Sequence, residues 1–172
     1  MKLIPLSIHS KINAGKFFAM VDDDMYDYLI HWDWSARLDS KNGNYYATRK
    51  FQIGKKRHVL QMHRFILGVT DGNIKVDHID HNGLNNQISN IRECTHKQNM
   101  ANVLSQKGST SIYKGVSWKA KNKAWIVQIT VEKKPVHIGC FKSELEAAKA
   151  YDIVAKKVYG EFAFLNFKSQ SL

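Results

Sequence analysis

The side chains best suited to chemistry lie in the segment that begins at Asp77-His78 and ends near Asn99. It supplies a carboxylate beside an imidazole, followed by the amides of Asn85-Asn86 and Asn90. Hydrolysis of a phosphodiester needs an activated water and neutralisation of the charge that develops in the transition state. One bound divalent ion can neutralise that charge. The segment therefore predicts a phosphodiesterase that uses a single metal ion.

The roles within such a site follow from ligand chemistry. Mg²⁺ prefers oxygen ligands and takes only one or two protein groups, so the Asp77 carboxylate and the Asn99 amide oxygen are the candidate metal ligands. His78 is the candidate general base, because the ordinary pKa of histidine lies near neutrality. Neighbouring residues on a regular strand point to opposite faces. We therefore expect the strand to bulge or end at residues 77–79, so that Asp77 and His78 serve one site.

The same residues resemble the His-Asn-His (HNH) nuclease motif, also called the ββα-metal or His-Me finger. They resemble most its homing-endonuclease branch of phages and introns, in which an Asn replaces the last His. The matching positions, in chain order, are Asp77-His78-Ile79-Asp80, Asn85-Asn86, Asn90 and Asn99. The resemblance implies that Asp77 and Asn99 bind the metal, and that His78 activates water. It also implies that Asn90 hydrogen-bonds across the loop and holds the strand that carries His78.

The departure from the full motif bears on the metal. An Asn at position 99 leaves a neutral oxygen ligand, which suits Mg²⁺ or Mn²⁺ better than Zn²⁺. The paired Cys motifs of zinc-stabilised relatives are missing, so no structural zinc is expected. Cys94 and Cys140 have no metal-like spacing and are expected to be free thiols in a reducing compartment.

Each residue of the motif also has a plainer reading. His78 alone would more often be a surface or hydrogen-bonded histidine, and the Asn residues alone would be turn formers. His81 lies in the loop and either touches phosphate or has no role. His63-Arg64 recurs in the resembling family just before the motif. That pair supports the site, contacts DNA, or is an ordinary part of a helix.

The elements that must position these residues are predicted by turn signals and periodicity. Residues 1–62 favour strands, with a hairpin turn at Asn42-Gly43. A strand then runs into a short helix that ends at Gly68. Residues 74–103 show the order strand, loop, strand, helix, with Thr95 as the helix N-cap, and this ββα unit completes a nuclease domain over residues 1–104.

A polar stretch without periodicity predicts a linker at residues 105–111. Beyond it, residues 112–168 predict strands at 115–118, 125–131 and 136–141. A helix opened by a capping box at Ser143 follows and is closed by Gly160. On the second strand the residues from Trp125 to Val131 alternate, which places Gln128, Thr130 and Ile126 on the outer face. The fold class is therefore α+β, with a β-rich region and a ββα-metal unit before a three-stranded antiparallel sheet packed on one helix.

About 55 residues of this second region resemble the Apetala-two/ethylene-response-factor DNA-binding domain. The matching segments are residues 113–118, 125–129, 137–141, 146–152 and 166–167. The resemblance implies that the sheet enters the major groove while the helix backs it. The DNA-facing candidates that it implies are Lys114, Ser117, Lys119, Gln128, Thr130 and His137, with Lys121 in the hairpin turn near phosphate.

These candidates differ from the plant members of that family. Ser117 and Thr130 are short and uncharged where plant members use Arg, so the plant recognition sequence does not transfer. Gln128 is suited to reading adenine, and Lys114 or Lys119 to reading guanine or binding phosphate. Trp118 and Trp125 are expected to belong to the core rather than to contact sugars.

The charge of the chain agrees with a polyanionic partner. Its formal net charge is +11, and the segment after residue 102 contributes +7 of that. Such a balance favours nucleic acid over an anionic membrane surface. No apolar run is long enough for a membrane helix, and the N-terminus has no signal-peptide core. We expect double-stranded DNA as the partner, no membrane, no small-molecule cofactor, a monomer, and a cytoplasmic location in a bacterial host of the encoding phage or intron.

The first functional hypothesis is thus a Mg²⁺-dependent, site-specific homing endonuclease. One alternative is a DNA-binding regulator with an inactive nuclease unit, but the motif residues are intact. Another is a nonspecific degradative nuclease or toxin, which does not explain a dedicated DNA-reading region. A monomer with one active site is expected to nick DNA, and a double-strand break would need a dimer or two sequential nicks.

Overall fold

A computed structural model describes residues 1–7, 16–40, 42–103 and 109–167. The chain forms two compact units, Met1–His96 and Lys97–Leu172. The division falls inside the helix of the expected ββα segment, so most of that helix belongs to the second unit. The expected linker at residues 105–111 lies partly outside the described residues, which resume at residue 109.

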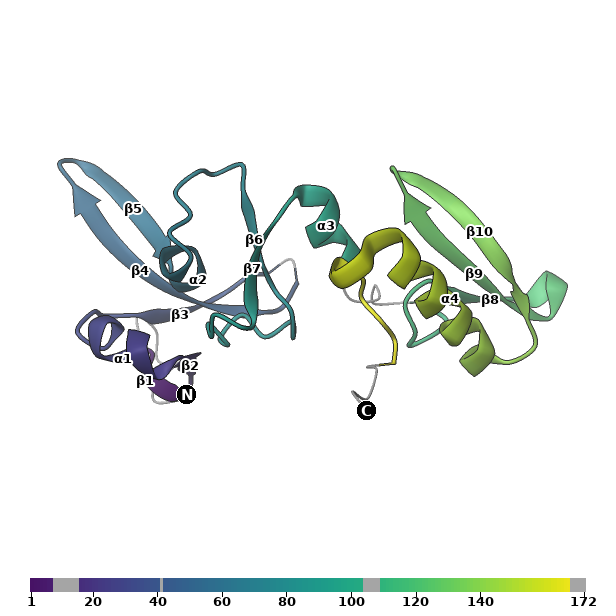
Figure 1. The fold of residues 1–172 in the computed structure, drawn as a ribbon, viewed down its shortest axis with the longest axis horizontal. Helices are drawn as coiled ribbons and strands as arrows, with labels where there is room; N and C mark the ends of the chain where they lie inside the picture. The colour runs from purple at the N-terminus through teal and green to yellow at the C-terminus, as the bar shows by residue number, and fades with distance from the viewer. Residues whose placement is uncertain (8–15, 41, 104–108, 168–172) are drawn as a thin grey trace. The chain divides into compact units, whose positions relative to one another are not determined.

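The first unit begins with small antiparallel sheets and short helices (Figure 1). Its elements up to the motif are β1 (Lys2–Pro5), β2 (Phe18–Val21), α1 (Asp23–Leu29), β3 (Ser35–Leu38), β4 (Tyr45–Ile53), β5 (Lys56–Gln61) and α2 (Met62–Ile66). β1 pairs with β2, and β4 lies between β3 and β5. The expected turn joins β3 to β4, and Gly43 takes a φ of 76° there, a left-handed conformation that glycine adopts without strain.

The motif residues follow on a two-stranded ribbon formed by β6 (Lys75–His78) and β7 (Ile91–Cys94). α3 (His96–Ala101) comes next, so the predicted order of strand, loop, strand and helix is observed. The strand was expected to bulge or end at residues 77–79, and it ends there without a bulge. Asp77 pairs with Arg92 and His78 with Ile91 in regular register. The strand simply ends after His78, because the chain turns at residues 79–80.

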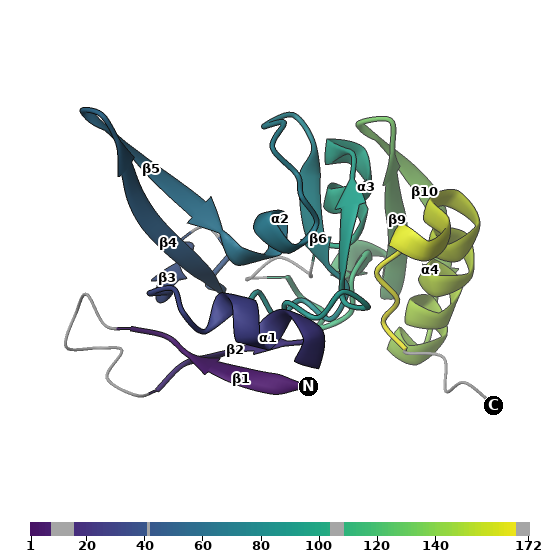
Figure 2. The same ribbon diagram turned by 60° about the vertical axis from the view of Figure 1, so that its left-hand side comes forward.

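The core of the first unit lies between β1, β2, α1 and the inner part of the three-stranded sheet. Trp34, Leu29 and Met62 are fully buried there, and Trp34 Nε1 donates a hydrogen bond of 3.0 Å to the Leu29 carbonyl. This core fixes the strands on which the motif loop rests. The β4–β5 hairpin extends beyond it, as Figure 2 shows.

The second unit is a three-stranded antiparallel sheet with a long helix along one face (Figure 1). Its elements are β8 (Val116–Lys119), a 3₁₀ turn (Ala120–Asn122), β9 (Ala124–Val131), β10 (Lys134–Phe141), α4 (Glu144–Tyr159) and a further 3₁₀ turn (Gly160–Phe162). The strand order is β10-β9-β8. One of the two hydrogen bonds of the expected capping box is observed, since Ser143 Oγ accepts a hydrogen bond from the Glu146 N–H at 3.4 Å.

The helix and the sheet enclose a core of small and β-branched side chains. Val127 and Ile129 from β9 meet Ala148 and Tyr151 from α4. The backbone before β8 passes very close to this helix. A Cβ at Gly115 would lie 2.1 Å from the Tyr151 ring, and the φ of 76° also demands glycine. Among the described residues, no helix is long and apolar enough to cross a membrane.

Candidate active site

His78 ends β6 inside a cluster of rings. The His63 ring from α2 meets it edge-on, with centroids 4.8 Å apart and an interplanar angle of 80°. The Tyr46 ring from β4 lies 5.7 Å from both imidazoles. His78 and His63 are 6% and 4% exposed, so two separate elements fix the orientation of the candidate base.

This environment favours neutral imidazoles. Burial lowers the pKa of His78, and this effect outweighs the opposing hydrogen bond with Asn86 and the nearby carboxylates. Burial, together with the charges of His78 and Arg64, lowers the pKa of His63 to about 3. A neutral His78 is ready to accept a proton at ordinary pH. His63 remains neutral beside it, and its buried Nδ1 has no hydrogen-bond partner among the described residues.

Asp77 has different neighbours from His78. It is 7% exposed, and its Oδ2 accepts hydrogen bonds from Arg92 Nη2 at 3.0 Å and Nε at 3.3 Å. Arg92 is its cross-strand partner on β7. Asp77 therefore contacts the neighbouring strand, whereas His78, at the end of β6, contacts the ring cluster.

A hydrogen-bond network centred on Asn90 holds the loop that follows His78. Asn90 Nδ2 donates to Asp80 Oδ1 at 2.9 Å and to the Asn85 carbonyl at 2.8 Å. Its Oδ1 accepts from the Asp80 backbone N–H at 3.0 Å, and its carbonyl accepts from the Ile79 N–H at 2.9 Å. The middle Asn therefore crosses the loop and joins both ends of it, the arrangement that the HNH resemblance implies.

Asp80 is the acceptor at the centre of this network. Burial raises the pKa of its carboxyl, but hydrogen bonds from Asn85, Asn82 and Asn90 outweigh that effect and leave the pKa below its usual value. Asn85 Nδ2 reaches Oδ2 at 2.7 Å, and the Asn82 N–H reaches Oδ1 at 2.8 Å. An ionised Asp80 thus organises the loop through the amides that the sequence supplies around it.

The N-terminal strands support the same loop. The Met20 N–H donates to the Leu84 carbonyl at 2.8 Å, and the Asn86 N–H donates to the Met20 carbonyl at 2.8 Å. Asp22 Oδ2 accepts from the Ile88 N–H at 2.7 Å. Asp22 occupies the N-cap position of α1 but makes no capping hydrogen bond, because its carboxylate serves the loop instead. Residues 18–22 therefore act as part of the scaffold of the site.

Gly83 lies where the loop approaches β4 most closely. A Cβ added there would lie 2.4 Å from the Tyr45 carbonyl oxygen and 2.6 Å from the Tyr46 ring. Gly83→Ala is therefore expected to destabilise the protein by about 1–3 kcal/mol, because the loop or the Tyr46 ring must move. Thermal unfolding measures this, with Gly72→Ala as the control, since a Cβ at Gly72 meets nothing within 4 Å. Equal melting temperatures for both variants would contradict the close packing.

The donors fit the chemistry of a hard divalent ion. A carboxylate and an amide oxygen match the few protein ligands that Mg²⁺ takes. Asp77 is already ion-paired with Arg92, and Asn99 lies on the part of α3 that belongs to the second unit. Among the described residues, no group of three or more His, Cys, Asp or Glu side chains is arranged to hold a metal.

The outer face of the second unit carries most of the predicted DNA-facing residues. The positions on the side of the sheet away from α4 are Ser117, Lys119, Gln128, Thr130 and His137. Gln128 and His137 are exposed cross-strand partners, and Lys121 is exposed in the 3₁₀ turn. Ile126 shares this face but is 6% exposed, so the expectation that it points to solvent is wrong.

Lys114 departs from the prediction. It was expected to point outward on the first strand, but it precedes β8, and its Nζ donates to the Ala101 carbonyl at 2.6 Å. The ammonium also lies 5.4 Å from the centre of the Phe164 ring, and burial lowers its pKa to about 8. The alternation of the strand does not extend to Lys114, because the chain turns at Gly115 just before the strand begins. Lys114 is therefore a structural contact at the end of α3.

The two tryptophans of the sheet were expected to belong to the core. Trp125 packs against the core of the second unit, as expected. Trp118 is its cross-strand partner, with ring centroids 5.1 Å apart, but is 39% exposed. Trp118 therefore covers Trp125 at the border of the core rather than lying within it.

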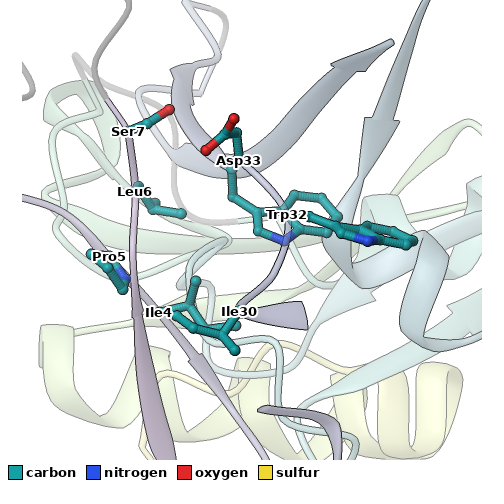
Figure 3. Close-up of a pocket in the computed structure, with 8 residues that line it drawn as sticks. Ile4, Pro5, Leu6, Ser7, Ile30, Trp32 and Asp33 are labelled. Carbon is teal, nitrogen blue, oxygen red and sulfur yellow. The ribbon is translucent and has the colours of Figure 1, made fainter. Parts of the chain in front are cut away.

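A pocket of about 320 Å³ in the first unit lies away from the motif (Figure 3). It is lined by Ile4, Pro5, Leu6 and Ser7 on one side, and by Ile30, Trp32, Asp33 and Trp34 on the other. No residue of the motif lines it. The pocket therefore contributes no lining residue to the candidate site.

Several residues of the site were not identified from the sequence. Neither Tyr46 nor Asp22 was assigned to the site from the sequence. The contact from Asp22 to Ile88 spans 66 residues, and no local pattern indicates it. Arg92 had a usable signal, because antiparallel pairing of the two short strands places it opposite Asp77.

Comparisons with known proteins match the segment that contains His78 to HNH endonucleases. The sequence profile described as HNH endonuclease matches residues 55–101. The chain is 36% identical over 158 residues to an uncharacterized HNH endonuclease of Acanthamoeba polyphaga mimivirus, which covers 87% of this chain and 74% of that protein. It is 30% identical over 117 residues to Protein 3.8 of Escherichia phage T7, covering 68% of this chain and 95% of that protein.

A plant protein matches a shorter part of the chain. The AP2/ERF and B3 domain-containing transcription repressor TEM1 of Arabidopsis thaliana is 40% identical over 73 residues. That alignment covers 42% of this chain but only 20% of the plant protein. It gives partial support to the resemblance seen in the second unit.

Proposed function

This chain belongs to the HNH endonuclease family, and we propose that it is a metal-dependent, site-specific DNA endonuclease of the homing type. The observation that carries the proposal is the buried His78 at the end of β6, which packs against the His63 and Tyr46 rings. The loop that follows it is held by hydrogen bonds of the Asn90 side chain. Fixing a neutral imidazole in one orientation is what a general base requires.

In this proposal each residue of the motif has a distinct task. His78 accepts a proton from the attacking water, and Asn90 keeps the strand end and the loop in register. Asp77 and Asn99 would hold the divalent ion, Mg²⁺ or Mn²⁺, which supplies charge neutralisation for the scissile phosphate. Arg92, paired with Asp77 Oδ2 at 3.0 Å, orients that carboxylate.

The second unit supplies site selection in this proposal. Its outer face presents Ser117, Lys119, Gln128, Thr130 and His137, and a sheet of this kind binds in the major groove. The resemblance to the Apetala-two/ethylene-response-factor domain and the partial plant match support this assignment. A single catalytic centre has little preference for DNA sequence, so the sheet bound in the major groove would set the position of the cut. We further propose that the protein acts as a monomer in the cytoplasm of a bacterial host.

Gln128 provides the test of site selection. Gln128→Ala is expected to lower discrimination between matched and mismatched sites by about 1–3 kcal/mol, because an amide pairs with adenine through two hydrogen bonds. Mapping the cut positions on a plasmid that carries the locus flanking the gene measures this. Lys149→Ala, on the exposed side of α4, is the control. If Gln128→Ala cuts with unchanged preference, Gln128 does not read the site.

A further inference from the structure

The outer half of the β4–β5 hairpin contributes nothing to the core of the first unit. This part, residues 50–59, is called here the hairpin arm. The core includes Ala47 on β4 and packs against Leu60 on β5, but takes no residue of the arm. Every arm residue except Phe51 is exposed. Isolated two-stranded hairpins are only marginally stable in water, so burial does not explain why the chain builds this one.

The arm is strongly cationic. Its charged residues are Lys50, Lys55, Lys56 and Arg57. The sequence contains no acidic residue between Asp39 and Asp71, so nothing nearby in the chain offsets this charge. Within the described part of the protein, none of these four cations forms a salt bridge. They are therefore available to an external polyanion.

The arm also has the shape of a groove-binding ribbon. Gln52 pairs with Arg57 and Ile53 with Lys56, and the two-residue turn starts at Gly54, whose φ is 58°. At the usual rise per residue, the arm reaches roughly 13 Å beyond its base. The major groove of B-DNA is about 12 Å wide and admits a two-stranded ribbon.

We propose that the hairpin arm is a second DNA-binding element, built into the nuclease unit, that holds the phosphates of duplex substrate independently of sequence. This inference rests on the proposed function, since the arm would add a second binding contact to the same DNA substrate. Charges on edge strands also discourage unwanted strand pairing. Lys55 lies in the turn and not on a strand edge, so that role does not account for every cation of the arm.

The test compares two triple variants that each remove three cations. The first is Lys55→Gln, Lys56→Gln and Arg57→Gln in the arm. The control is Lys149→Gln, Lys156→Gln and Lys157→Gln, on the exposed side of α4. Binding to a short duplex of mixed sequence is measured in EDTA over a series of salt concentrations, and thermal unfolding verifies that both variants are folded.

Each phosphate contact contributes about −0.9 to the slope of log K against log salt. The arm variant is expected to make the slope shallower by about 2–3, while the control keeps the wild-type slope. Equal slopes for the arm variant and wild type would overturn the proposal, and so would equal losses in both variants. Because this assay needs no cleavage, its outcome is separate from the outcome for the nuclease proposal.

Discussion

His78→Ala is expected to lower the rate of DNA cleavage by about 10²–10⁴-fold, the usual contribution of a positioned general base. The affinity for DNA should change little, because the basic surfaces of both units are untouched. The reason is structural, since His78 is the residue that places an imidazole at the end of β6. His63 contacts the His78 ring but lies on α2. Burial lowers the pKa of His63 to about 3. Single-turnover cleavage at saturating enzyme measures the loss.

The matched control for this variant is His81→Asn. His81 lies in the same loop with a φ of 66°, a conformation that Asn tolerates. Its cleavage rate should stay within a few-fold of wild type. Cleavage by His78→Ala at the wild-type rate would show that water is activated by another group.

The second large effect is expected for Asn90→Ala. The substitution removes two donated hydrogen bonds and one accepted hydrogen bond from a side chain that is only 7% exposed. Leaving those partners unsatisfied should cost ~2–3 kcal/mol of folding free energy. Cleavage should fall as well, because the Asn90 side chain joins Asp80, two residues after His78, to Asn85 in the loop. Chemical denaturation and cleavage rates measure the two effects.

Asn73→Ala is the comparison, since Asn73 is exposed in the connection from α2 to β6. Its unfolding free energy should stay within about 0.5 kcal/mol of wild type. If Asn90→Ala unfolds like Asn73→Ala, the hydrogen bonds across the loop contribute nothing to stability. If its stability falls but its activity at low temperature does not, Asn90 supports the fold without positioning His78.

Local signals were enough to predict most of the elements. The turn at Asn42-Gly43, the strand and loop around His78, and the capping box at Ser143 depend on neighbouring residues. The alternation on β9 also placed Gln128 and Thr130 on the outer face. Lys114 was misplaced, because the position carried over from the family resemblance was taken to lie on the first strand, which begins only at Val116.

The surroundings of His78 were less predictable, because they come from distant parts of the chain. Tyr46 and His63 reach it from other elements, and Asp22 and Met20 hold its loop from far upstream. The strand does end at His78, within the expected range, but without a bulge. Asp77 is ion-paired with Arg92 across the ribbon, and His78 lies in the ring cluster.

The central claim is that this HNH-family chain cuts DNA by metal-dependent chemistry at a chosen site. The most direct measurement incubates purified protein with supercoiled plasmid carrying the locus that flanks the gene, in Mg²⁺ and in EDTA. The account predicts nicking at one mapped position in Mg²⁺ and intact plasmid in EDTA. Retention of plasmid in a bound complex without any cut, in Mg²⁺ and in Mn²⁺ alike, would contradict it and leave a DNA-binding protein.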